Sequence, residues 1–177
     1  MGRRVFSVLV PLLALALTVG ACGKEIGDSC SFATDCDPNG QRICIDPTAG
    51  HGGYCTIQGC DYSTCPDESA CVRFFTGTFA NKTCAPETEA MTPQCSPDEL
   101  CSIQNDVADP KQGHCVPRAS ETRFCMRKCD SNDDCRDGYE CRTFALMQQH
   151  GGEPVLAPGV LVTEETAPKF CAVAPAK

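Results

Sequence analysis

The chemistry of this 177-residue chain depends first on its 17 cysteines. An odd number of thiols cannot all pair, and a leftover thiol is a liability in an oxidising compartment. One cysteine is therefore expected to have a role of its own. The candidate is Cys22, which lies directly beyond an apolar run near the start of the chain.

The first 21 residues predict a secretory signal peptide. Arg3 and Arg4 precede an apolar run from Val5 to Val19. This run of 15 residues is shorter than the ~20 residues that a helix needs to span a bilayer. A basic start, a short apolar middle and small residues at its end are typical of a segment that is removed after export.

The residues Val19-Gly20-Ala21-Cys22 resemble the lipobox of bacterial lipoproteins, in which an aliphatic and two small residues precede a cysteine. The resemblance implies that residues 1–21 are cut off and that Cys22, lipidated on its sulfur, becomes the N-terminus. Each buried methylene of an acyl chain adds ~0.8 kcal/mol, so two or more chains anchor a protein stably. Gly23, in place of Asp, implies the outer membrane. The alternative is ordinary secretion, with Cys22 free or in a disulfide.

Composition beyond residue 21 predicts a fold held by disulfides. These 156 residues contain 23 Leu, Ile, Val and Phe and no Trp, and 13 basic against 23 acidic residues give a net charge of −10. So few apolar residues alone would indicate disorder. Cysteines make up about 11% of the segment, which is typical of a small disulfide-rich domain. The acidic balance argues against nucleic acid as a partner.

The sixteen cysteines after Cys22 divide into two sets of eight around the cysteine-free segment 85–94. Five of the seven spacings agree within one residue between the sets, which indicates a tandem duplication. We expect four bridges within each half, although sequence leaves the pairing open and bridges between the halves are the alternative. The expected disulfide cysteines are Cys30, Cys36, Cys44, Cys55, Cys60, Cys65, Cys71, Cys84, Cys95, Cys101, Cys115, Cys125, Cys129, Cys135, Cys141 and Cys171.

The predicted organisation is a tether at 22–29, a first cysteine-rich domain at 30–86, a linker at 87–94 and a second domain at 95–177. Short β-hairpins and long irregular loops should build both domains. We expect 42–45 to pair with 54–57, 70–75 with 82–85, and 113–116 with 122–126.

The longest spacing, residues 142–170, predicts a helix from 143, then turns, then a strand at 160–165. Long loops on rigid scaffolds often carry function. This loop also holds a large share of the scarce apolar residues, and packing onto the domain's own core is favoured over a partner surface. Its apolar residues are Leu146, Met147, Val155, Leu156, Val160, Leu161 and Val162.

Signals for catalysis, a cofactor or a metal are weak in this sequence. There is no C-x-x-C pair and no H-E-x-x-H, and His51, His114 and His150 lie far apart. Asp130, Asn132 and Asp134 alternate as in a calcium loop, but Cys135 and Cys141 replace the required Gly and Glu. We therefore expect a protein that is not an enzyme, with no cofactor and no metal.

Residues 124–141 resemble cysteine-rich repeats of exported proteins and lipoproteins from Gram-negative bacteria. The resemblance implies a location and an architecture rather than an activity. The favoured function is a lipid-anchored binding or structural module of the cell envelope, with an envelope or extracellular protein or a glycan as its partner. The alternative is a protease inhibitor that presents Arg42, Arg118 or Arg123 to a trypsin-like enzyme.

Overall fold

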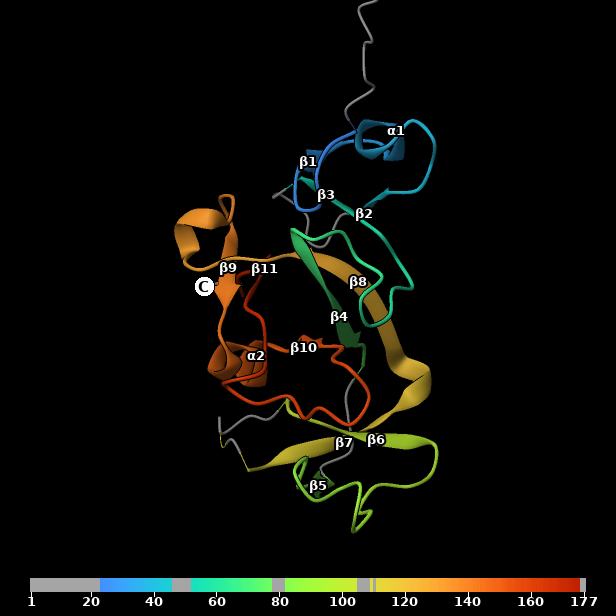
Figure 1. Cartoon of the computed structure of the whole chain (residues 1–177), viewed down its shortest axis with the longest axis vertical. Coiled ribbons are helices and arrows are strands. Elements are labelled where there is room, and N and C mark those ends of the chain that lie inside the picture. The colour runs from blue at the N-terminus through green and yellow to red at the C-terminus, as the bar shows by residue number, and fades with distance from the viewer. Residues whose placement is uncertain (1–22, 46–51, 78–81, 105–108, 110, 176–177) are drawn as a thin grey trace, which may run out of the picture.

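A computed structural model of the chain describes residues 23–45, 52–77, 82–104, 109 and 111–175. Short strands and long loops build an elongated body, which the chain enters beside α1 at one end (Figure 1). The elements are β1 (Ser29–Cys30), α1 (Ala33–Cys36), β2 (Ile43–Ile45), β3 (Gly53–Thr56), β4 (Ser69–Phe75), β5 (Thr83–Cys84), β6 (Glu99–Ser102), β7 (Gly113–Pro117), η1 (Arg118–Ser120), β8 (Glu121–Arg127), η2 (Asn132–Asp134), β9 (Tyr139–Arg142), α2 (Phe144–His150), β10 (Glu153–Pro154) and β11 (Phe170–Val173).

The described strands form four small sheets, all with antiparallel pairing. Their strand orders are β1-β3-β2, β10-β4-β8, β5-β7-β6 and β11-β9. The central pair β4–β8 is the longest, and it runs from Ser69 opposite Arg127 to Phe75 opposite Glu121. The sheets of β1 and β5 lie at opposite ends of the body (Figure 1). The small disulfide-rich fold class predicted from composition is confirmed.

Each sheet carries one unit of four cysteines with the same pairing. In every unit the first cysteine bonds to the third and the second to the fourth. The third and fourth lie directly opposite each other on paired strands, yet they do not bond to each other. The bridges are Cys30–Cys44 and Cys36–Cys55, Cys60–Cys71 and Cys65–Cys125, Cys84–Cys101 and Cys95–Cys115, and Cys129–Cys141 and Cys135–Cys171.

The third unit is inserted within the second, which corrects the expected closure of two halves. Cys65 bonds to Cys125 across a separation of 60 residues, and Cys84 bonds to Cys101. Six bridges stay within the predicted halves and these two cross between them, so the prediction of four separate bridges in each half is wrong. The physical reason is the β4–β8 pairing, which brings Cys71 and Cys125 opposite each other.

The local predictions succeeded where the partner was near in sequence. β2 and β3 form the expected hairpin, and α2 begins after Thr143, whose hydroxyl accepts from the Leu146 amide at 3.4 Å. The other two hairpins are wrong, because β4 pairs with β8 and β7 pairs with β5 and β6. Residues 160–165 form turns and irregular chain rather than the expected strand.

The main core is built around the β4–β8 pair. Val72, Met126 and the partly buried Phe124 lie on one face of the pair and Cys71 and Cys125 on the other, since successive side chains of a strand point to opposite sides. The remaining buried side chains come from several other segments: Ile26, Tyr54, Cys60, Ile103, Tyr139, Met147, Phe170 and Ala172. Among the described residues, no helix has the length and apolar character to cross a membrane.

Residues 23–29, which were predicted to form a tether, belong to the folded body. Ile26 is completely buried in the main core. The Gly27 amide donates to the Cys55 carbonyl, and the Cys55 amide donates to the Asp28 carbonyl, both at 2.9 Å. The prediction of a tether is therefore wrong for this segment, because one apolar side chain and two backbone hydrogen bonds fix it.

Candidate lipid-attachment site and binding groove

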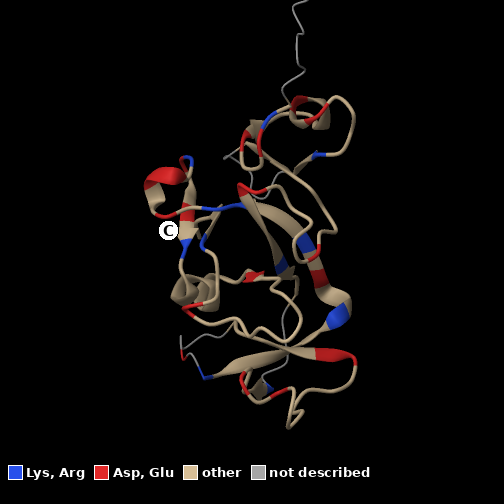
Figure 2. Cartoon of the chain, in the orientation of Figure 1, with Lys and Arg blue, Asp and Glu red and all other residues tan. Residues whose placement is uncertain are grey.

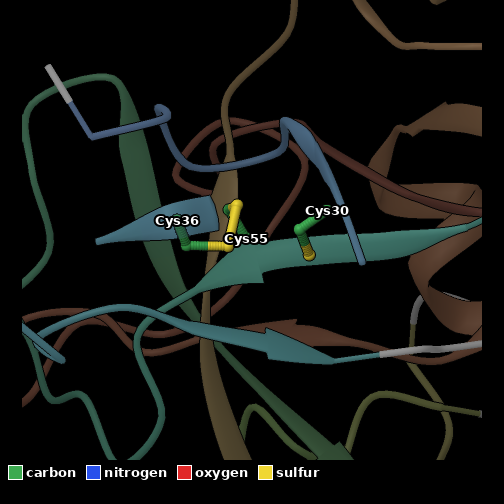
Figure 3. A group of neighbouring side chains, drawn as sticks. All are labelled: Cys30, Cys36 and Cys55. Atoms are coloured by element: carbon green, nitrogen blue, oxygen red, sulfur yellow. A yellow bond between two sulfur atoms is a disulfide. The ribbon is translucent and has the colours of Figure 1, made fainter. Parts of the chain in front are cut away.

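Sulfur atoms gather at the centre of each unit, but they are not available as metal ligands. In the first unit the sulfurs of Cys30, Cys36 and Cys55 lie within 4.8 Å of one another, and Figure 3 shows Cys30 beside the Cys36–Cys55 bridge. Similar groups occur in the other units. A metal requires a thiolate, and every one of these sulfurs is already in a disulfide. The groups are therefore the interior of each unit.

The eight bridges account for sixteen of the 17 cysteines, and the remaining one is Cys22. Cys22 lies outside the described residues. Among the described residues all sixteen cysteines pair with one another, so none of them is left as a partner for Cys22.

The Asp-rich turn considered as a calcium loop is capped by its own side chains. One carboxylate oxygen of Asp134 accepts from the Asp130 amide at 2.8 Å and the Ser131 amide at 2.9 Å. These amides, Ser131 first, lower the pKa of Asp134. Asn132 Oδ1 accepts from the Cys141 amide at 2.8 Å. These oxygens hold the turn together, as expected for Asp and Asn in turns.

An apolar hollow of about 410 Å³, here called the aromatic groove, lies between the central sheet and the β9–β11 pair. Phe74 and Phe124 have ring centroids 6.4 Å apart, and Tyr54 stacks on Tyr139 at 5.4 Å. Its lining residues are Ile45, Tyr54, Phe74, Thr76, Thr122, Phe124, Met126, Tyr139, Arg142, His150, Ala172 and Val173. Tyr54 and Tyr139 are buried at the base of the groove, and Phe74 and Phe124 are half-buried, so the two phenylalanine rings are the aromatic surface open to apolar or planar groups of a ligand.

A charged cluster on β9 and α2 forms one rim of the aromatic groove. Glu140 Oε1 lies 2.7 Å from His150 Nδ1 and accepts from Arg142 Nε at 3.1 Å. Arg142 also donates to the carbonyls of His150, Gly151 and Val173 at 2.7–2.9 Å. Burial lowers the pKa of the Arg142 guanidinium, and Glu140 opposes this shift. Arg142 therefore ties the loop after α2 to the end of β11.

Two tyrosines and a stacked arginine join the first unit to the fourth. The Arg136 guanidinium lies 4.3 Å from the Tyr139 ring centroid and 5.6 Å from that of Tyr54. The Tyr54 hydroxyl accepts from the Arg127 amide at 2.9 Å, and burial raises the pKa of Tyr54. Sequence reasoning did not select Arg136 or Arg142 as site residues. The signal available was that each directly follows a cysteine, Cys135 and Cys141.

The apolar residues of the long loop divide between the core and the surface. Met147 is completely buried, and Val155 and Val162 pack against the main core. Val160 and Leu161 are 46% and 44% exposed beside a smaller cleft of about 220 Å³. The expectation that this loop packs on its own core therefore holds for one part of it, and two residues remain on the surface.

The three arginines considered for protease inhibition occupy different environments. Arg123 is half-buried on β8, where it pairs with Glu121 and, at 3.0 Å, with Asp61. Arg42 is also half-buried and donates to the Lys24 carbonyl. Arg118 is exposed, in the one-turn helix η1. The structure does not bring these three side chains onto one loop.

The described histidines are separate from each other. His150 belongs to the rim of the aromatic groove, whereas His114 lies on β7, opposite Ser102 and Thr83 in the neighbouring strands. His51 lies outside the described residues. With the described cysteines all bridged, this part of the chain offers neither histidine a thiol to activate.

Comparison with known proteins gives one match, to a cysteine-rich relative. No family model matches the chain, and no solved structure matches it. Progranulin of Rattus norvegicus is 26% identical over 153 aligned residues, which cover 69% of this chain and 25% of that protein. The chain thus spans about a quarter of the length of the curated relative that it matches. The eight disulfides of the described residues agree with an extracellular or envelope location.

Proposed function

We propose that this protein is a non-enzymatic module of the cell envelope, held at a membrane by lipid on Cys22, that binds a partner protein in its aromatic groove. The observation that carries the proposal is the bridge count, because all sixteen cysteines of the described residues pair with one another and Cys22 stands outside these eight bridges. Cys22 also closes the lipobox-like sequence Val19-Gly20-Ala21-Cys22. Gly23 in the next position favours the outer membrane.

Several observations support binding rather than catalysis. Disulfides on this scale need an oxidising compartment, which agrees with export. The aromatic groove is a hollow of about 410 Å³ in which the half-buried rings of Phe74 and Phe124 are accessible, and this volume suits apolar side chains of a partner segment.

Lipid attachment is tested by metabolic labelling with an alkyne analogue of palmitate. The full chain and Cys22→Ala are produced in a Gram-negative host, with Met91→Ala, a change at an exposed side chain, as the matched control. We expect label and membrane recovery for the wild type and the control, and at least tenfold less of both for Cys22→Ala. A labelled Cys22→Ala variant, or a mature wild-type chain beginning elsewhere than Cys22, would overturn the anchor.

Partner binding is tested with a photo-crosslinking amino acid at Thr76, an exposed residue of the aromatic groove. The same amino acid at Met91, which is 80% exposed and outside the groove, is the control. We expect a discrete crosslinked protein in intact cells for position 76 alone. A diffuse product that glycosidases remove would indicate a glycan instead, and equal products at both positions would rule out the groove.

A further inference from the structure

The proposed lipid site adjoins the folded body without a spacer. Gly23 lies so close to α1 that a Cβ atom placed on it would be 2.6 Å from the Cys36 carbonyl oxygen and 3.6 Å from the Asp37 Cα. Cys22 precedes Gly23 directly, so their Cα atoms are ~3.8 Å apart. Any acyl chain on Cys22 therefore starts within a few bonds of the first unit.

The segment after Gly23 leaves little freedom to swing away from the body. Ile26 is completely buried in the main core, and Lys24 Nζ donates to the Ser29 carbonyl at 2.6 Å. Gly27 packs against Arg127, because a Cβ on it would lie 3.0 Å from two side-chain carbons of that residue. Residues 23–29 are therefore held against the first unit rather than extended away from it.

The surface next to this attachment point carries an exposed aromatic side chain. Phe32, directly before α1, is 71% exposed, and its neighbours Ser31, Ala33 and Thr34 are exposed and uncharged. A helix rises ~1.5 Å per residue, so the four residues of α1 span ~6 Å. Because Gly23 contacts Cys36 and Phe32 is the residue directly before α1, Gly23 and Phe32 lie at the two ends of this four-residue helix.

The fourth unit shows that this turn does not require a phenylalanine. Asp35 accepts from the amides of Ser31 and Phe32 at 2.8 and 2.9 Å, as Asp134 does from Asp130 and Ser131. Phe32 thus occupies the position that Ser131 fills in the equivalent turn. Polar residues are preferred there because they cap helices, so turn formation does not account for an exposed phenylalanine.

Acidic groups near this end have partners within the protein. Glu25 and Asp28 lie 3.6 and 3.8 Å from Arg127 on β8, and the Asp37 carboxylate accepts from the amides of Asn39 and Gln41. Figure 2 shows acidic and basic residues interspersed along the whole described chain. The acidic side chains near Phe32 are therefore held within the protein by one arginine or by backbone amides.

We infer that Phe32 enters the bilayer interface and that the module rests directly on the membrane, with the sheet of β5, β6 and β7 projecting outward. This inference depends on the proposed lipidation of Cys22. Segments that lie in a membrane interface present side chains such as Trp, Phe and Leu on the face that enters it. In Figure 1 the end carrying α1 is opposite the end carrying β5.

Tryptophan fluorescence tests this placement, because the chain contains no tryptophan. Phe32→Trp and Met91→Trp each introduce a single fluorophore at an exposed position, the second in the loop between β5 and β6. Full-length lipidated protein is reconstituted into phosphatidylcholine vesicles with and without brominated acyl chains. We expect brominated lipid to reduce Phe32→Trp emission at least twofold and to leave Met91→Trp emission unchanged.

The two proposals fail in different ways. If mass spectrometry of the N-terminal peptide finds no lipid on Cys22, the proposed anchor fails. If Cys22 carries lipid and Phe32→Trp is quenched no more than Met91→Trp, only the inference about Phe32 fails. A thermal unfolding midpoint equal to that of the wild type establishes that each tryptophan variant is folded.

Discussion

The first unit and the central β4–β8 sheet share one bridge pattern but differ in what else stabilises them. The buried cluster of the first unit consists of Cys30, Cys36 and Cys55, with Cys44 packed against it. The central sheet instead carries the main apolar core. Disulfides therefore form the interior of the first unit, whereas in the central sheet they supplement an apolar core. The comparison shows that the same pairing supports a small loop and a long insertion.

The largest effect is expected from removing the bridge that closes the insertion. A loop of about 60 residues gives at most ~4 kcal/mol in the chain-entropy model, because other bridges already shorten it. We expect Cys65→Ala/Cys125→Ala to lower the free energy of unfolding by about this amount, as measured by urea unfolding. A loss under 1 kcal/mol would mean that the β4–β8 core holds the insertion without sulfur.

Removing a bridge from the first unit should have a more local effect. Cys30→Ala/Cys44→Ala opens a separation of 14 residues, worth ~3 kcal/mol in the same model. Since this unit has a cluster of cysteines as its interior, we expect faster amide hydrogen exchange in residues 29–45 and 52–56. Exchange in β4 and β8 should stay within twofold of the wild type. Uniform acceleration throughout would show that the units are one cooperative body.

Sequence predicted the first unit better than the central sheet, for a physical reason. β2 and β3 are close in the chain, and the Gly-rich segment between them favours a hairpin. The pattern of residues 70–75 suits a strand equally well with any partner, so the local partner at 82–85 was preferred over β8. The prediction of a tether at residues 22–29 was wrong for a similar reason. Ile26 is a single apolar residue, so no periodic pattern in the sequence indicates that it is buried.

The sequence predicted one part of the candidate site, Cys22, and did not predict the other part, the aromatic groove. Parity and the lipobox-like sequence single out Cys22 from the sequence alone. The aromatic groove is lined by Tyr54, Phe74 and Tyr139, which lie on three different sheets. The groove therefore cannot be predicted from the sequence without knowing that β4 pairs with β8. Likewise, the role of Arg142 depends on carbonyls from α2 and β11 that a linear pattern cannot bring together.

A smaller effect is expected where the two regions meet. Tyr54→Phe removes the hydroxyl that accepts from the Arg127 amide, while the ring stack on Tyr139 remains. A typical hydrogen bond contributes ~1 kcal/mol, and we expect a loss of this size in urea unfolding. Tyr62→Phe, at a side chain that is 50% exposed, is the control and should change stability by less than ~0.5 kcal/mol. An equal loss of unfolding free energy in Tyr54→Phe and Tyr62→Phe would contradict a specific contribution from the Tyr54–Arg127 hydrogen bond.

The smallest effect concerns pH and compares equivalent turns in the first and fourth units. Backbone amides lower the pKa of Asp35, chiefly that of Ser31, and likewise that of Asp134, chiefly that of Ser131. A carboxylate whose folded pKa is depressed stabilises the protein above its unfolded pKa of ~3.9, and this stabilisation is lost as the pH falls through the folded value. We therefore expect the thermal unfolding midpoint of the wild type to decrease as the pH is lowered below about 4. The decrease should be smaller for Asp35→Asn and Asp134→Asn, which lack one of these carboxylates.

The difference between these two variants is the more informative measurement. Both units continue into the main core, the first through Tyr54 on β3 and the fourth through Phe170 on β11. Beside the turns themselves, Cys36 of α1 is buried among the cysteines of the first unit, whereas Cys135 after η2 also packs against the main core. Asp35→Asn should therefore accelerate hydrogen exchange around α1 more than Asp134→Asn does around η2. Equal acceleration in the two turns would mean that the apolar core adds nothing to a unit beyond its sulfur. The contrast between the regions would then lie in loop length alone.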